Sequence, residues 1–188
     1  MEEYYPANCA DWQKWLEANH HSKQSVWIVF YNKNSGKDSI SWSEAVETAL
    51  CFGWIDSKKQ TIDEFSYRQF YSKRKPNSTW SKINKDKVQM LIETGQMMPA
   101  GFESIEIAKQ NGLWTILDEV EELIVPKDLE ATFITQKGSK DYFLSLNKSM
   151  RKTILQWIVL AKIAETRQNR INQVAELAAK GQKPKQFG

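Results

Sequence analysis

The hydrophobic pattern of this 188-residue chain changes from strand-like to helix-like along its length, and this change restricts the fold class most strongly. Ser25–Tyr31 is a nearly continuous run of β-branched and aromatic residues, which is typical of a buried strand. Trp54–Ile62 and Phe65–Ser72 also have strand character, and the two acidic residues between them predict an antiparallel hairpin. Apolar residues then recur at helical spacing over Ser149–Ala161 and Glu165–Lys180. We therefore predict an α+β fold, with a small antiparallel sheet in the N-terminal half packed with helices and a C-terminal helical unit.

The length of the chain suits one large domain, or a domain with a smaller appended unit. We place the α+β region at residues 1–120 and a C-terminal helical region, packed on it, at residues 121–181. No linker-like composition separates the two regions, so we expect them to form one body. The Gly-, Lys- and Pro-rich end predicts a disordered tail over residues 182–188.

Charge and hydropathy restrict the binding partners and the cellular location that we expect for this chain. The formal net charge is only +3, which by itself supports neither a nucleic-acid nor a membrane surface. No apolar run approaches the ~20 residues of a membrane-spanning helix. The acidic start Met1-Glu2-Glu3 is unlike a signal peptide, so we expect a cytoplasmic protein. The two cysteines, Cys9 and Cys51, have no zinc-site or disulfide-framework spacing, and we predict that both are reduced and that Cys51 is buried.

Several catalytic signatures are absent from the sequence. The only histidines, His20 and His21, are adjacent at an expected helix end, where surface histidines are more common than catalytic ones. Ser35-Gly36-Lys37 lacks the earlier glycine and the following Ser or Thr of a phosphate-binding loop. No nucleophile elbow, dinucleotide-binding glycine pattern or metal-ligand cluster is present. We therefore expect no metal and no cofactor, and we favour binding over catalysis.

One group of polar and aromatic residues between positions 54 and 84 is the candidate site. If the hairpin turns at Asp63-Glu64, Asp56 lies opposite Phe70 and Lys58 opposite Arg68, so that Asp56 and Arg68 can form an ion pair. The other members supply cations, a capping serine for a helix near Trp80, and indoles for stacking, which together suit an anionic group. The candidate residues are Trp54, Asp56, Tyr67, Arg68, Arg74, Ser78, Trp80 and Asn84.

Two further readings of the basic residues stay open. The same residues can have purely structural roles, with the tryptophans in the core and Asp56–Arg68 as a structural pair. Basic residues interleaved with Phe70, Tyr71 and Trp80 also suit a nucleic-acid surface, although the small net charge makes this less favourable. A second polar cluster, Thr166, Arg167 and Arg170, is explained either by packing of the Arg stems against the N-terminal sheet or by ligand contact.

Motifs along most of the chain have a recognisable order. They include Gly53-Trp-Ile-Asp56, Ser78-Thr-Trp-Ser-Lys-Ile-Asn84, Met97-Met-Pro-Ala-Gly101 and Glu165-Thr-Arg-Gln-Asn-Arg-Ile171. Over roughly residues 5–181 the chain resembles the YdeI/OmpD-associated (bacteriocin-protection) family. The family name implies an association with bacteriocin or antimicrobial-peptide resistance and with an outer-membrane porin. It supplies no catalytic residues to transfer.

The sequence thus leads to three functional hypotheses. The first is a non-enzymatic cytoplasmic binding or stress-protection protein, with a pocket for a small anionic ligand or a surface for a protein partner. The second is an enzyme of unknown class that uses Asp56, Tyr67 or Arg74 as acid, base or anion holder. The third is a nucleic-acid-binding protein, whose affinity would fall steeply with salt.

Overall fold

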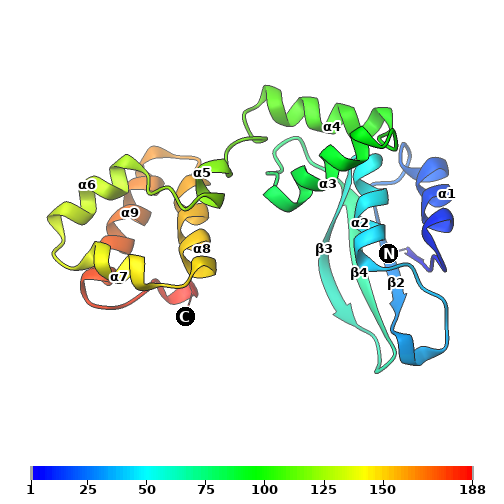
Figure 1. Cartoon of the computed structure of the whole chain (residues 1–188), viewed down its shortest axis with the longest axis horizontal. Coiled ribbons are helices and arrows are strands. Elements are labelled where there is room, and N and C mark those ends of the chain that lie inside the picture. The colour runs from blue at the N-terminus through cyan, green and yellow to red at the C-terminus, as the bar shows by residue number, and fades with distance from the viewer. Residues whose placement is uncertain (1, 188) are drawn as a thin grey trace. The chain divides into compact units, whose positions relative to one another are not determined.

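The computed structural model describes residues 2–187, so Met1 and Gly188 lie outside the described residues. The chain divides between Trp114 and Thr115 into two compact units, called here unit 1 and unit 2 (Figure 1). Within the described residues, all strands belong to unit 1, and unit 2 contains helices and loops. The α+β class predicted from the sequence is confirmed.

Unit 1 is built on a four-stranded sheet with the order β1-β2-β4-β3. The strands are β1 (Glu3–Tyr4), β2 (Ser25–Tyr31), β3 (Trp54–Thr61) and β4 (Ser66–Lys73). The predicted hairpin is present as β3 and β4, and β2 pairs antiparallel with β4. The short edge strand β1 runs parallel to β2, so the sheet is mixed rather than purely antiparallel.

The hairpin contains a β-bulge that the sequence pattern did not reveal. Asp56 lies opposite Tyr71, whereas Lys59 lies opposite Gln69, so two residues of β3 face the single residue Phe70 of β4. Because a bulge adds one residue to one strand, the register shifts along the hairpin. The predicted pairing of Asp56 with Phe70 and of Lys58 with Arg68 is wrong, because the turn brings Ile62 to Ser66 and sets a different register: Asp56 faces Tyr71, and Arg68 faces Gln60.

Helices cover one face of this sheet, and α2 packs on β3 (Figure 1). Ser41 begins α2 as a capping box with Glu44, and Gly53 follows the helix end with a left-handed φ of 70°. The core between sheet and helices includes Trp12, Ile28 and Trp54, all fully buried. The helical elements of unit 1 are α1 (Cys9–Asn19), a 3₁₀ turn (Lys33–Ser35), α2 (Trp42–Cys51), α3 (Lys82–Glu93) and α4 (Pro99–Gln110).

Helix α4 crosses the end of α2 at very short range. A Cβ on Gly101 of α4 would lie 2.4 Å from the carbonyl oxygen of Cys51 and 2.9 Å from that of Leu50. A Cβ on Gly53 would lie 2.8 Å from the carbonyl oxygen of Ala100. The missing side chains of these two glycines therefore fix how closely α4 approaches the end of α2.

Unit 2 has its own apolar core, formed by residues such as Leu129, Phe143 and Leu155. Its elements are α5 (Asp118–Glu121), α6 (Lys127–Thr135), α7 (Ser139–Ser145), α8 (Lys148–Val159), α9 (Ala164–Ala179) and a 3₁₀ turn (Lys185–Phe187). The two helices predicted in the last third correspond to α8 and α9. Where composition predicted a disordered tail, the ring of Phe187 makes an edge contact with Trp157, at 5.5 Å between centroids. None of the helices in residues 2–187 has both the length and the apolar character needed to cross a membrane.

The two cysteines differ sharply in accessibility. Cys51 is buried and Cys9 is exposed, and both are free thiols. Burial, with a smaller contribution from Cys9, raises the pKa of the Cys51 thiol to about 11. Because the thiolate is the reactive form, we expect a thiol reagent at pH 8 to label Cys9 quickly and Cys51 only slowly. Mass spectrometry of the labelled native protein tests this, and rapid labelling of the Cys9→Ser variant would contradict it.

Candidate functional site

A pocket of about 190 Å³ lies in unit 1 where the hairpin β3–β4 ends beside α4; it is called here the Arg74 pocket. Two backbone hydrogen bonds hold its central segment: Arg74 N–H donates to Gly53 O at 2.9 Å, and Lys73 N–H donates to Gln24 O at 3.0 Å. The backbone hydrogen bonding therefore continues from the sheet to the rim of the pocket. The lining residues are His20, His21, Phe52, Gly53, Lys73, Arg74, Lys75, Pro76, Ser78, Trp80, Ala100, Glu103, Ser104, Ile107 and Ala108.

The guanidinium of Arg74 is the charged centre of this pocket. It lies 3.6 Å from the ring centroid of Trp80, in a cation–π contact, and its Nη1 donates to Thr79 O at 3.1 Å. Its Nε is buried and has no hydrogen-bond partner among the described residues. Burial lowers the pKa of Arg74 to about 10, an effect that the charge of Asp56 partly offsets. Arg74 therefore stays cationic at neutral pH, although it is half-buried.

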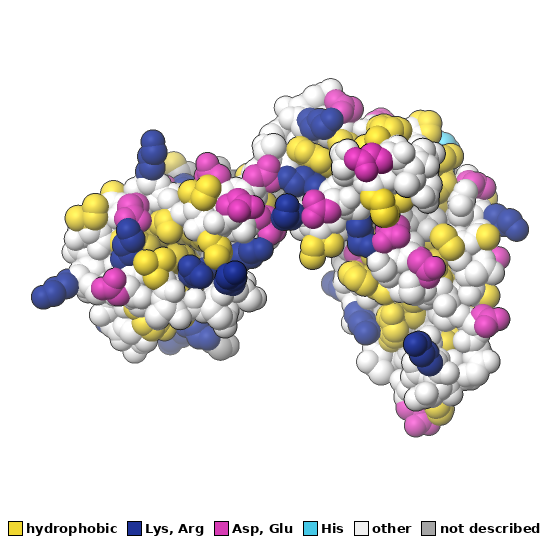
Figure 2. Space-filling model, in the orientation of Figure 1, with side chains coloured by type: hydrophobic (Ala, Val, Ile, Leu, Met, Phe, Trp, Pro, Cys, Tyr) yellow, Lys and Arg dark blue, Asp and Glu magenta, His cyan; other side chains and the backbone are white. Residues whose placement is uncertain are grey.

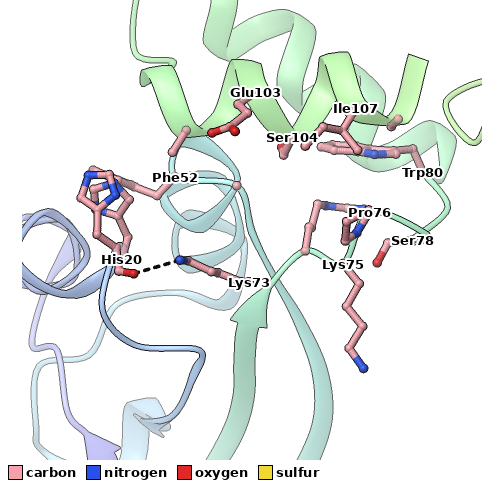
Figure 3. Close-up of a pocket in the computed structure, with 15 residues that line it drawn as sticks. His20, Phe52, Lys73, Lys75, Pro76, Ser78, Trp80, Glu103, Ser104 and Ile107 are labelled. Atoms are coloured by element: carbon pink, nitrogen blue, oxygen red, sulfur yellow. Dashed lines mark hydrogen bonds between the residues drawn. The ribbon is translucent and has the colours of Figure 1, made fainter. Parts of the chain in front are cut away.

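The remaining polar groups of the pocket are mostly cationic or neutral. Lys73 Nζ donates to His21 O at 3.1 Å, shown by the dashed line in Figure 3. Glu103 and Ser104 project from α4 toward the pocket, and Lys75 extends away from it (Figure 3). Glu103 is the only carboxylate among the lining residues, against the three cations Lys73, Arg74 and Lys75. The pocket therefore favours a negatively charged ligand.

Three of the eight predicted site residues line the Arg74 pocket: Arg74, Ser78 and Trp80. Trp80 is 1% exposed, so its ring supports Arg74 from below and is not a free stacking surface. Ser78 does not cap a helix as predicted. The cap of α3 is Ser81, whose side chain accepts from Asn84 N–H. Asn84 thus lies in the first turn of α3, outside the pocket lining.

The other predicted residues are elsewhere in unit 1. Trp54 is fully buried in the core. Asp56 and Tyr67 line a separate pocket. Arg68 does not pair with Asp56. It forms an ion pair with Glu3 and lines neither of the two pockets. The eight residues do not form the single predicted site: Asp56 pairs with Tyr71 and so lies on the opposite face of the sheet from Arg68, and Trp54 is in the core.

Sequence reasoning missed the α4 residues of the pocket, Glu103, Ser104 and Ile107, and treated His20 and His21 only as surface residues. The histidines lie in the turn after α1 and the other three residues on α4, before and after the hairpin, and no spacing in the sequence connects them. The one available signal was Gly101, since a glycine inside a helix often marks close packing.

The aromatic residues that supported a nucleic-acid surface are mostly inaccessible. Tyr71 and Trp80 are buried, so neither can stack on a base. Burial also raises the pKa of Tyr71 far above its ordinary value. On the face shown in Figure 2, basic side chains are interspersed with acidic ones over both units. The geometry therefore favours a shaped pocket over a nucleic-acid surface.

Two family models match the chain. Residues 4–104, more than half of its length, match a domain of unknown function (DUF8412). Residues 122–181 match the model described as bacteriocin-protection, YdeI or OmpD-associated. The chain belongs to the DUF8412 family and carries a YdeI/OmpD-associated region. No curated protein and no solved structure matches it.

The resemblance seen in the sequence is therefore confirmed for residues 122–181. The motifs Gly53-Trp-Ile-Asp56 and Ser78–Asn84 lie instead in the part that matches DUF8412. All but two of the residues that line the Arg74 pocket fall within this match, and Ser104 is its last residue; Ile107 and Ala108 lie just beyond it.

The second polar cluster belongs to the YdeI/OmpD-associated region and has structural partners. Arg167 donates two hydrogen bonds to the Asp128 carboxylate, at 2.6 and 3.0 Å, and this contact lowers the pKa of Asp128. Arg170 donates to Trp157 O at 2.5 Å and lies over the Trp157 ring. Both arginines join α9 to neighbouring elements of unit 2, which favours a packing role, but these partners are not in the N-terminal sheet as predicted. Within residues 2–187, no three His, Cys, Asp or Glu side chains are grouped to hold a metal ion.

Proposed function

We propose that this protein acts by binding, and that its DUF8412 domain holds a small anionic ligand in the Arg74 pocket. The observation that carries the proposal is the state of Arg74. It is a half-buried cation whose contacts are one indole face and one carbonyl oxygen. Among the described residues, no carboxylate oxygen lies within 4.0 Å, the ion-pair distance, of a guanidinium nitrogen of Arg74.

A buried cation with no carboxylate at ion-pair distance is unfavourable, because it has lost water and gained little in return. An anion in the pocket would complete the hydrogen bonding of the guanidinium and offset its desolvation. The volume of about 190 Å³ is below the ~300–1,000 Å³ of pockets for drug-sized ligands. The expected ligand is therefore the size of a phosphate or a short carboxylic acid.

Phosphate binding by Arg74 variants tests the proposal. Arg74→Met keeps an apolar stem on Trp80 but removes the charge. It should weaken phosphate binding by about 1.5–3 kcal/mol, the range for a hydrogen bond to a charged group. Its stability should change by less than about 1 kcal/mol, because the lost cation–π contact is offset by relief of the buried charge. Isothermal titration calorimetry and urea unfolding measure the two effects.

Arg68→Met is the matched control, since Arg68 is an arginine of the same hairpin that lines neither pocket. It should leave phosphate affinity unchanged. Equal weakening in both variants would indicate only long-range charge attraction, and absence of saturable binding in the wild-type protein would reject phosphate-sized anions. Turnover of a bound metabolite would support the enzyme hypothesis instead. The protective role and the cytoplasmic location that we expect from the sequence stay predictions. Anion binding would be the first step of the protective role.

A further inference from the structure

A second pocket of about 390 Å³ in unit 1, called here the Asp56 pocket, is lined by one carboxylate and one ammonium group. Its lining comes from three elements: Trp42 from α2, Asp56 and Lys59 from β3, and Tyr67 and Gln69 from β4. The bulge is what places Asp56 and Lys59 together, because it brings Lys59 opposite Gln69.

The carboxylate of Asp56 is held in a fixed orientation. Trp42 Nε1 and Gln69 Nε2 both donate to its Oδ2, each at 2.9 Å. Gln69 is 5% exposed and also donates to Ser57 O at 2.9 Å, which locks its amide. Among the described residues, no Lys or Arg nitrogen lies within 4.0 Å, the ion-pair distance, of the Asp56 carboxylate. The pocket thus contains an oriented carboxylate whose charge has no ion-pair partner.

Two aromatic rings flank this carboxylate. Trp42 is 46% exposed, so part of its indole ring is accessible to a ligand. Tyr67 is half-buried, with its ring stacked on Phe30 at 5.0 Å between centroids and 5° between planes. The ammonium of Lys59 lies 4.0 Å from the Tyr67 centroid. The wall of the pocket therefore already holds an ammonium, supplied by the protein's own exposed lysine.

We propose that the Asp56 pocket binds a protonated alkylamine, which takes the place of the Lys59 ammonium over Tyr67 and pairs with Asp56. A carboxylate between aromatic rings is suited to cations, because the ring faces and the carboxylate both attract positive charge. An anion would meet the charge of Asp56 at close range. This inference rests on different residues from the Arg74 pocket and does not depend on the function proposed for it.

Lys59 acts in this arrangement as a tethered competitor. A tethered group occupies its position at a high effective concentration, so its removal should strengthen binding of a free amine. For an exposed cation–π contact the gain is about two- to fivefold in affinity. Asp56→Asn keeps an oxygen that can accept from Trp42 but removes the charge, and it should weaken amine binding about tenfold or more.

The test uses n-butylammonium as the probe and n-butanol as its uncharged counterpart. The readout is the indole N–H resonance of Trp42 in ¹H–¹⁵N NMR spectra, assigned with Trp42→Phe. We expect a saturable shift with n-butylammonium, a larger affinity in Lys59→Ala, a smaller one in Asp56→Asn, and no saturable shift with n-butanol. Lys58→Ala, which removes the neighbouring exposed lysine of the bulge, should leave the affinity unchanged.

Three results would overturn the proposal. The first is the absence of a saturable shift in both the wild-type protein and Lys59→Ala. The second is equal binding of n-butylammonium and n-butanol, which would reduce the site to an apolar contact. The third is unchanged amine affinity in Asp56→Asn, whose folding the same NMR spectra report.

Discussion

Replacing Gly101 with alanine should destabilise the protein by about 3 kcal/mol, the upper end of the usual range for overpacking. Helix propensity alone predicts the opposite sign, since alanine is favoured over glycine inside a helix by roughly 0.5–1 kcal/mol. The clash decides the outcome. Met97 Sδ, at 2.3 Å from the added Cβ, can rotate away, but the carbonyl oxygens of Cys51 and Leu50 belong to the helix end beneath α4 and cannot.

Urea unfolding measures this effect, with Phe102→Ala as the control. Phe102 is the next residue of α4 and is 44% exposed, so its truncation should cost little. Because α4 carries Glu103 and Ser104, its displacement by Gly101→Ala should also weaken phosphate binding at the Arg74 pocket. Unchanged or increased stability of Gly101→Ala would show that α4 does not pack against the end of α2 as closely as described.

Trp80→Ala should cost about 3–5 kcal/mol of unfolding free energy, the range for a fully buried aromatic residue. Trp80 contacts Trp114, at 5.0 Å between ring centroids, and supports Arg74 on its face. Its removal should therefore open a cavity in the core and release the guanidinium. Trp42→Ala is the control, because that indole is largely exposed and should cost under about 1 kcal/mol.

A double-mutant cycle separates the two roles of Trp80. If Arg74 is positioned by the indole, Arg74→Met should have less effect on phosphate affinity in the Trp80→Leu background than in the wild-type protein. Leucine retains part of the apolar volume, so that this background stays folded. Additive effects on phosphate affinity would mean that Trp80 contributes only to the core.

The sequence was sufficient to predict the elements that depend on local patterns. Strand β2 is a continuous β-branched and aromatic run, and α8 and α9 follow helical spacing, so each was found close to its observed bounds. The β3–β4 hairpin was found from its turn. The parallel edge strand β1 was not predicted, because two residues carry no periodicity.

The candidate site was predicted only in part, for two physical reasons. The first is the hairpin register: the turn brings Ile62 to Ser66, so Asp56 lies opposite Tyr71 instead of Phe70 and on the other face of the sheet from Arg68. The second is that the Arg74 pocket needs α1 and α4, whose residues are brought to Arg74 by tertiary packing alone. The choice of Ser78 over Ser81 as the helix cap was a local error: both serines precede an apolar helix, and only the hydrogen bond to Asn84 N–H distinguishes them.

The bulge in β3 also bears on how this hairpin tolerates change. In a regular ladder continued from Asp56–Tyr71, Lys58 rather than Lys59 would lie opposite Gln69. Both positions are lysine, so a one-residue slip of β3 would exchange one ammonium for another beside Asp56. A deletion in β3 that removes the bulge but keeps both lysines would therefore still leave one ammonium beside Asp56.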